Sequence, residues 1–133
     1  MTEIDPFPRV PVSWGELVDK LTILEIKIER LRDPGAVANA RRELAPLAAA
    51  LAALTPPPVG LAGLQAELRA VNLRLWDIED AIRAKEAQGA FDAGFIELAR
   101  GVYRTNDERS RIKRAINLLL RSGIVEEKQY APY

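Results

Sequence analysis

Two stretches of the sequence decide the fold: LAGLQAELRAVNLRLWDIEDAIRAKEAQ (residues 61–88) and AGFIELARGVYRTNDERSRIKRAINLLL (residues 93–120). Apolar residues recur in both at steps of three and four, the spacing that places side chains on one face of a helix. These residues are Leu61, Leu64, Leu68, Val71, Leu75, Ile78 and Ile82 in the first stretch, and Leu98, Val102, Ile112, Ile116 and Leu119 in the second. Gly89 between the stretches is a natural helix stop, and Asp92 a natural helix cap. We therefore predict a long antiparallel helical hairpin whose second helix is stopped by Gly123.

The second helix of this hairpin has a polar middle, because residues 104–111 contain no apolar side chain. When the hairpin folds about its turn, residues whose numbers sum to roughly 181 lie level with one another. Asp77 is then level with Arg104, and Asn72 with Arg109. We predict a polar layer between the two helices. Its candidate binding residues are Asp77, Asp80, Arg104, Asn106 and Arg109.

Two structural interpretations compete with a binding role for this layer. Ion pairs between helices and a register-setting Asn are well-attested uses of buried polar groups, and we favour this interpretation. Thr105 and Glu108 also have the spacing of a capping box, which marks the start of a helix. In this alternative the second helix of the hairpin is divided into two shorter helices. No Pro or Gly marks such a break.

Two shorter helices precede the hairpin. Ser13 and Glu16 form a capping box at the start of the first, whose apolar face runs to Leu31. Asp33 caps the second, which ends at about Leu54, before three consecutive prolines. We therefore predict an all-α fold, an antiparallel bundle of about four helices in which residues 1–133 form a single domain.

The two ends of the chain lie outside these helices. Residues 1–12 alternate prolines with apolar side chains, so we expect an extended arm that lays those side chains over the bundle. Residues 124–133 form a C-terminal tail that is too short to fold alone and is expected to dock on the bundle or on a partner. The helices of the hairpin are longer than the first two, which leaves their far ends uncovered in a simple bundle. From this mismatch we predict a homodimer.

The composition excludes several classes of function. Lys and Arg balance Asp and Glu at 19 each, so no global field draws the protein to nucleic acid or anionic lipid. The absence of Cys and His excludes thiol nucleophiles, thiolate zinc sites and imidazole acid–base chemistry. The start MTEIDPFPRVPVS does not resemble a secretory signal, and the alanine-rich residues 44–54 are about half the length of a membrane span. We expect a cytoplasmic protein with no nucleic-acid partner, no membrane partner and no cofactor.

These observations favour a non-enzymatic, homo-oligomeric interaction or binding module. A protein partner is one candidate ligand, and a small anion is another, because six Arg and Lys residues cluster within residues 100–114. The alternative is a metal-dependent enzyme. If Glu25 and Glu29 meet Asp77 and Asp80, the four carboxylates can hold magnesium, as acidic helix pairs do in all-α nucleotide pyrophosphohydrolases.

Four segments together resemble a family of short bacterial all-α proteins of unknown function. They are PVSWGELVDKLTILEIK (residues 11–27), VNLRLWDIEDAIR (residues 71–83), FIELARGVYRTNDERSRIKRAINLLL (residues 95–120) and VEEKQYAPY (residues 125–133). The resemblance spans nearly the whole chain and implies that residues 12–27, 75–83 and 103–117 act together. It implies no activity, ligand or catalytic residue.

Overall fold

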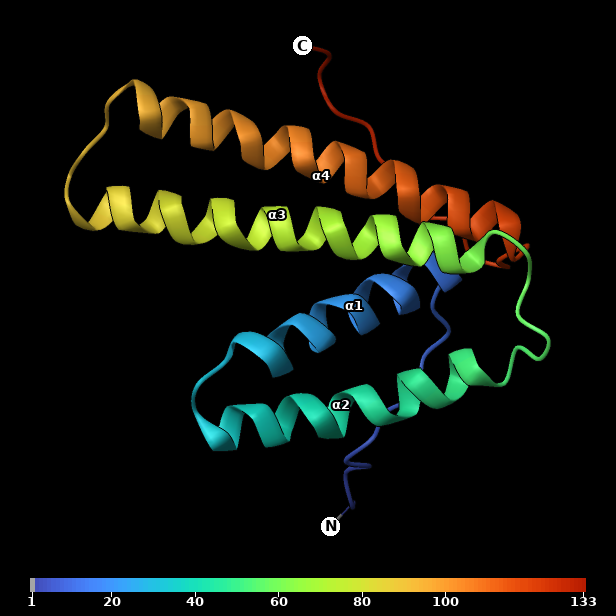
Figure 1. The fold of residues 1–133 in the computed structure, drawn as a ribbon. Helices are drawn as coiled ribbons and strands as arrows, with labels where there is room; N and C mark the ends of the chain where they lie inside the picture. The colour runs from blue at the N-terminus through green and yellow to red at the C-terminus, as the bar shows by residue number, and fades with distance from the viewer. Residues whose placement is uncertain (1) are drawn as a thin grey trace.

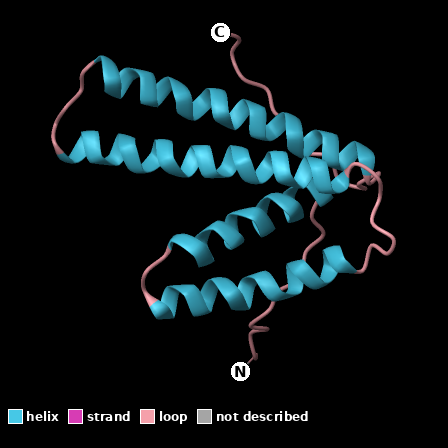
Figure 2. Cartoon of the chain, in the orientation of Figure 1, coloured by secondary structure: helices cyan, strands magenta, loops and turns pink. Residues whose placement is uncertain are grey.

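A computed structural model describes residues 2–133, which form four α-helices and no strand (Figures 1 and 2). The helices are α1 (Trp14–Arg30), α2 (Pro34–Ala52), α3 (Leu61–Ala87) and α4 (Ala93–Leu119). The predicted all-α bundle is therefore confirmed, and each helix begins within a residue or two of its expected position. The capping predictions are also confirmed. Backbone N–H groups of Glu16, Ala36 and Phe95 donate to the side chains of Ser13, Asp33 and Asp92.

Helices α3 and α4 pair along their full length as the predicted hairpin (Figure 1). Gly89 has a φ of 65° at the turn, a backbone conformation that favours glycine. The α4 helix is continuous, and Thr105 in its middle is buried, so the alternative with a break at this residue is wrong. A continuous helix is possible here because the polar residues of α4 find partners on α1 and α3.

The C-terminal end of α4 differs from the prediction. The helix ends at Leu119, and Arg121, not Gly123, adopts the left-handed conformation with a φ of 51°. The N–H of Ser122 donates to the carbonyl of Asn117 at 2.8 Å, which is the long hydrogen bond of a Schellman motif. This motif reverses the chain, so residues 122–133, here called the C-terminal segment, return along α4.

Helix α1 is the centre of the packing. It contacts α2 on one side and both α3 and α4 on the other, whereas α2 packs on α1 alone (Figure 1). The core between α1 and the hairpin consists of apolar side chains that are almost completely buried. They include Val18, Leu68, Val71, Ile112 and Ile116. The hairpin extends beyond α1 and α2 at its turn, as the helix lengths predicted (Figure 1). None of the helices in residues 2–133 is both long and apolar enough to cross a bilayer.

The N-terminal arm, residues 2–12, does not cover the bundle as expected. Ile4, Phe7 and Val10 are 89%, 66% and 74% exposed, and the arm runs away from the helices (Figure 1). Prolines at positions 6, 8 and 11 hold the backbone extended, and the arm passes α2 and projects into solvent (Figure 1). Its direction corrects the sequence-based expectation.

Candidate functional site

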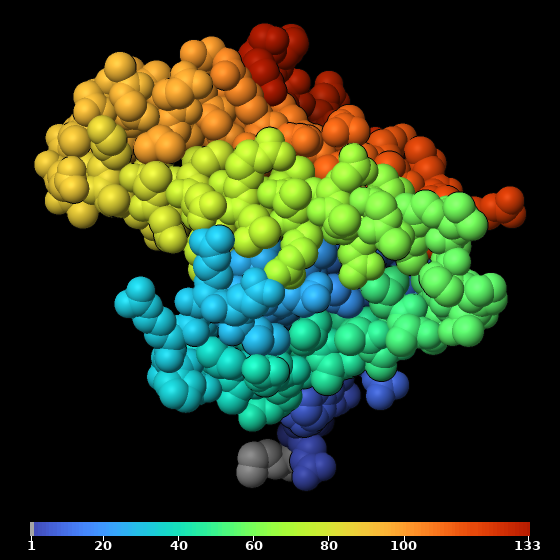
Figure 3. All heavy atoms as spheres, in the orientation of Figure 1, coloured from blue at the N-terminus to red at the C-terminus, as the bar shows by residue number. Residues whose placement is uncertain are grey.

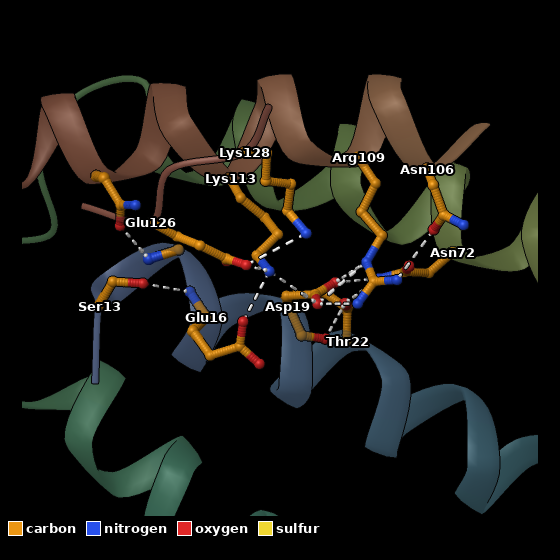
Figure 4. A network of polar contacts seen from close by, with 12 residues as sticks. Ser13, Glu16, Asp19, Thr22, Asn72, Asn106, Arg109, Lys113, Glu126 and Lys128 are labelled. Carbon is orange, nitrogen blue, oxygen red and sulfur yellow. Dashed lines mark hydrogen bonds and ion pairs between the residues drawn. The ribbon is translucent and has the colours of Figure 1, made fainter. Parts of the chain in front are cut away.

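A buried carboxylate, Asp19 on α1, connects three helices (Figure 4). It is 1% exposed, and it accepts hydrogen bonds from Arg109 Nε at 3.0 Å and from Arg109 Nη2 at 2.6 Å. Asn72 of α3 donates its side-chain N–H to the same carboxylate at 2.9 Å. A two-pronged contact from a guanidinium is a strong and geometrically specific way to compensate a buried carboxylate. Asp19 therefore fixes the orientation of the Arg109 side chain.

Neighbouring polar groups complete this network. Thr22 accepts a hydrogen bond from Asn72 and donates one to the Asp19 carbonyl, at 2.9 Å and 2.7 Å. Asn106 accepts from Arg109 Nη1 at 3.3 Å. The partners lie three residues apart on α1 and on α4, the spacing that places side chains on one helix face. Within residues 2–133 no buried side-chain nitrogen or oxygen is left without a hydrogen-bond partner.

Lys113 extends the network to the C-terminal segment. Its Nζ lies 2.7 Å from Glu16 of α1, 3.7 Å from Asp19 and 3.2 Å from Glu126 of the segment (Figure 4). Burial alone lowers the pKa of Lys113 and of Arg109, but hydrogen bonds and charges from the carboxylates outweigh burial and raise both pKa values. Both side chains are therefore fixed cations. The hydrogen bond from Lys113 lowers the pKa of Glu126, which keeps this glutamate ionised.

The close approach of α1 to α4 depends on Gly15. Its backbone N–H donates to Asn117 Oδ1 at 2.6 Å. A Cβ atom at this position would lie 2.4 Å from the carbonyl oxygen of Lys113, a distance that no side chain can accept. The neighbouring N–H of Trp14 donates to Ser122 Oγ at 3.2 Å. The first turn of α1 is thus held against the end of α4 by groups from both α4 and the C-terminal segment.

A pocket of about 650 Å³ lies between α4 and the C-terminal segment, at the outer edge of this network. Its apolar wall includes Val102 and Tyr103 of α4 and Tyr130, Pro132 and Tyr133 of the segment. The rings of Tyr103 and Tyr133 meet edge to face, with centroids 5.1 Å apart. The Tyr133 hydroxyl donates to Asp107, and this bond raises the pKa of the tyrosine. The segment therefore forms one side of the pocket.

The polar part of the pocket is mainly cationic. Arg109, Lys113 and Lys128 line it, against one carboxylate, that of Asp107. Asn106 and Ser110 add groups that form hydrogen bonds. Arg109 uses only part of its five-donor guanidinium on Asp19 and Asn106, so it retains donor capacity for a further acceptor. Each of the three cations also has a carboxylate partner, because Asp19 pairs with Arg109 and Glu126 pairs with both lysines. The pocket thus combines aromatic walls with cationic hydrogen-bond donors whose charge is already compensated.

Comparison with known proteins places the chain in a family. A family described as "Family of unknown function (DUF6165)" matches residues 8–132. The chain belongs to this family. No curated protein and no solved structure matches it. The resemblance seen in the sequence is thereby confirmed as an uncharacterised family.

Two of the five predicted site residues of this DUF6165 member belong to the network and line the pocket: Asn106 and Arg109. The prediction that Asn72 lies level with Arg109 is also correct, because both side chains bind Asp19. The sequence identified these positions through the gap in the apolar pattern of α4.

The other three predicted residues lie elsewhere on this family member. Asp77 is 63% exposed at its side chain and pairs with Arg30 at 2.7 Å. Asp80 is exposed, and Arg104 points to Glu97 of its own helix at 3.7 Å. Asp77 and Arg104 therefore do not pair as predicted. The pairing rule for a hairpin predicts the position of a residue along the helix axis. It does not predict the side of the helix on which the residue lies.

The magnesium site proposed from Glu25, Glu29, Asp77 and Asp80 is not formed either. Glu29 pairs with Arg69 at 2.5 Å and Asp77 with Arg30, so each of these carboxylates has its own cation. Residues 2–133 contain no group of three or more His, Cys, Asp or Glu side chains that could hold a metal ion. This geometry gives no support to the pyrophosphohydrolase alternative for this DUF6165 chain.

Sequence reasoning missed the centre of the network. Asp19 and Thr22 interrupt the broad apolar face of α1, flanked by the buried residues Val18 and Leu21. Polar residues three apart within an apolar helix face were the available signal. Glu126 lacked any comparable signal, because its contact with Lys113 depends on the chain reversal after α4.

Proposed function

We propose that the protein is a non-catalytic binding module, and that the pocket between α4 and the C-terminal segment is its binding site. The ligand chemistry that fits is an acidic group joined to an aromatic or aliphatic group. The observation that carries this proposal is the juxtaposition of Arg109, Lys113 and Lys128 with the tyrosine wall of one pocket.

Preorganisation supports the proposal. A binding site gains affinity when its polar groups are already fixed, because less side-chain entropy is lost on binding. Asp19 holds Arg109 through two guanidinium nitrogens, and Glu16 and Glu126 hold Lys113. The cationic N–H donors are therefore in place before a ligand arrives.

The size and lining of the pocket also support binding. Small-molecule and peptide side-chain sites are typically clefts of about 300–1,000 Å³ with apolar walls and a few polar groups. The volume of about 650 Å³ falls within this range. Tyrosine provides a large apolar contact area together with a hydroxyl that forms hydrogen bonds.

Binding without turnover is the chemistry that these groups favour. A general base needs a carboxylate or imidazole that is available to take a proton. Around this pocket, however, Asp19, Glu16 and Glu126 each accept from a cation, Asp107 accepts from the Tyr133 hydroxyl, and the sequence has no His or Cys. We also propose that the module acts in the cytoplasm, in line with a chain that contains no cysteine.

A thermal-shift comparison tests the proposal. Phenyl phosphate carries both parts of the expected ligand, whereas inorganic phosphate and benzyl alcohol carry one part each. A ligand at about ten times its dissociation constant stabilises the folded protein by about 1.4 kcal/mol. We expect phenyl phosphate to raise the melting temperature more than either part alone.

Variants locate the effect. Tyr103→Ala and Lys128→Gln should each reduce the shift caused by phenyl phosphate, because one removes part of the aromatic wall and the other a cation. The control is Ile96→Ala, an exposed position on the same helix outside the pocket. Equal shifts with inorganic phosphate alone, or shifts that both pocket variants retain, would overturn the proposal.

A further inference from the structure

The N-terminal arm presents an apolar sequence to solvent. Ile4, Phe7 and Val10 are exposed, and prolines alternate with them along residues 2–12. Proline fixes the backbone close to the extended polyproline conformation, which makes no internal hydrogen bonds. Such a segment loses little conformational entropy on binding and is suited to recognition by another surface.

The pocket has the features that recognise a segment of this kind. Proline-rich extended segments dock in grooves lined by aromatic side chains, and Tyr103, Tyr130 and Tyr133 line this pocket. The polar groups are also complementary. The arm carries the carboxylates of Glu3 and Asp5, and Arg109 at the pocket retains N–H donors beyond those that Asp19 and Asn106 occupy. Charge-assisted hydrogen bonds of this kind fix the orientation of an acidic ligand.

The arm and the pocket lie on opposite sides of the same molecule. In Figures 1 and 3 the arm projects below α2, whereas the C-terminal segment, which forms one side of the pocket, rises above α4. The arm therefore leads away from the pocket of its own chain. Two copies that lie side by side in opposite orientations place the arm of each beside the pocket of the other.

We propose that the arm of one copy occupies the pocket of a second copy, and that two copies exchange arms to close a homodimer. Phe7 supplies the apolar group, and Glu3 and Asp5 supply the acidic groups. Reciprocal exchange uses both pockets and leaves no open end, which one-way exchange would not achieve. This inference rests on the proposed function, because it names the occupant of the same pocket.

Sedimentation equilibrium of the full chain tests the exchange. Phe7→Ala and Tyr103→Ala should each raise the dissociation constant of the dimer by about tenfold or more, because each removes a large apolar contact. Ile96→Ala on α4 is the matched control and should leave the constant within about twofold. Both Phe7 and Ile96 are exposed in the single chain, so neither change affects its core.

Mixing the two defective variants gives a sharper readout. The Phe7→Ala chain retains its pocket, and the Tyr103→Ala chain retains its arm. Neither associates well with itself, because both of its arm–pocket contacts are damaged. In a mixed dimer one contact is intact, and the other has lost both Phe7 and Tyr103, where the second loss costs little because the two side chains share one contact. We expect the mixture to associate more strongly than either variant alone. The proposed hydrogen bonds to the acidic groups add that a Glu3→Gln, Asp5→Asn chain dimerises more weakly.

Three results would overturn the inference. They are a monomer at all concentrations, a dimer that Phe7→Ala leaves unchanged, and a mixture no stronger than its components. A further result concerns a wild type that is monomeric. If a labelled peptide of residues 2–12 then binds the Phe7→Ala chain, the arm of each chain occupies its own pocket, and the exchange between two copies is rejected. Phenyl phosphate separates the two proposals. If it still binds the pocket, only the arm exchange fails, and if it does not, the proposed function fails as well.

Discussion

At the scale of single residues, Asp19 is a buried carboxylate that links α1 to α3 and α4. Desolvation of a buried charge is costly and is offset only by close partners. Asp19 meets this condition with Arg109, Lys113 and Asn72, which come from two other helices. The same contacts fix Arg109 and Lys113, two of the three cations that line the pocket, so one side chain serves both packing and the candidate site.

Replacing Asp19 by Asn should therefore destabilise the protein strongly. The change keeps the shape of the side chain but leaves Arg109 and Lys113 without their shared buried counter-charge, at a cost of about 3 kcal/mol in the free energy of unfolding. Urea denaturation measures this cost. The matched change Asp77→Asn breaks an exposed pair with Arg30 and should cost less than about 1 kcal/mol. Equal losses in the two variants would show that the buried network has no special role.

The sequence allowed part of this site to be predicted, for a physical reason. A gap in an apolar stripe marks polar residues that face other helices, which identified Asn106 and Arg109. The same gap does not tell which side of the neighbouring helix supplies the partner. That depends on where α1 crosses the hairpin, so Asp19 was missed and Asp77 was chosen instead.

At the scale of elements, the position of α1 depends on a close backbone contact at Gly15, a residue that has no side chain. Gly15 allows the α1 backbone to approach the carbonyl of Lys113. Helix starts were predictable because N-caps are local, as Ser13, Asp33 and Asp92 demonstrate. The path of the arm and the end of α4 were not, because they depend on long-range packing and on the left-handed conformation of Arg121.

Two glycine-to-alanine changes test this packing. At Gly15 the new methyl group would collide with backbone, so α1 must shift, and we expect a loss of about 1–3 kcal/mol in the free energy of unfolding. At Gly63 in α3 nothing lies within 4 Å of the new atom, and alanine should stabilise the helix by about 0.5–1 kcal/mol. Thermal or urea unfolding of both variants decides. A neutral Gly15→Ala change would show that the close approach is not required.

Acid should loosen the C-terminal segment. The pKa of Glu126 is lowered, chiefly by its hydrogen bond from Lys113, so its contribution is present above its ordinary pKa of 4.5 and is lost as pH falls through its lower folded-state pKa. Amide resonances of residues 124–133 should shift as the pH falls below about 4.5. Glu126→Gln should remove the step, and Glu127→Gln, in an exposed pair with Arg114, should retain it. A step that survives in Glu126→Gln would assign it to another carboxylate.

At the scale of the whole molecule, the fold separates two exposed features. The hairpin and C-terminal segment form the pocket on one side, and α2 and the arm occupy the other (Figure 3). Helix α1 joins the two halves through its apolar contacts and through Asp19. The bundle was predictable from periodicity, because periodicity specifies which face of each helix is buried. The pocket was not, since it arises only when the chain reverses after α4.

The most direct test of the binding pocket is a nuclear magnetic resonance titration of the ¹⁵N-labelled full chain with phenyl phosphate. We predict that the amide shifts concentrate at the pocket, at Tyr103, Asn106, Ser110, Lys128 and Tyr130. The exposed hairpin end at Phe91 and Ile96 should remain unchanged and provides an internal control. No perturbation, or a perturbation centred on the hairpin end, would contradict the account.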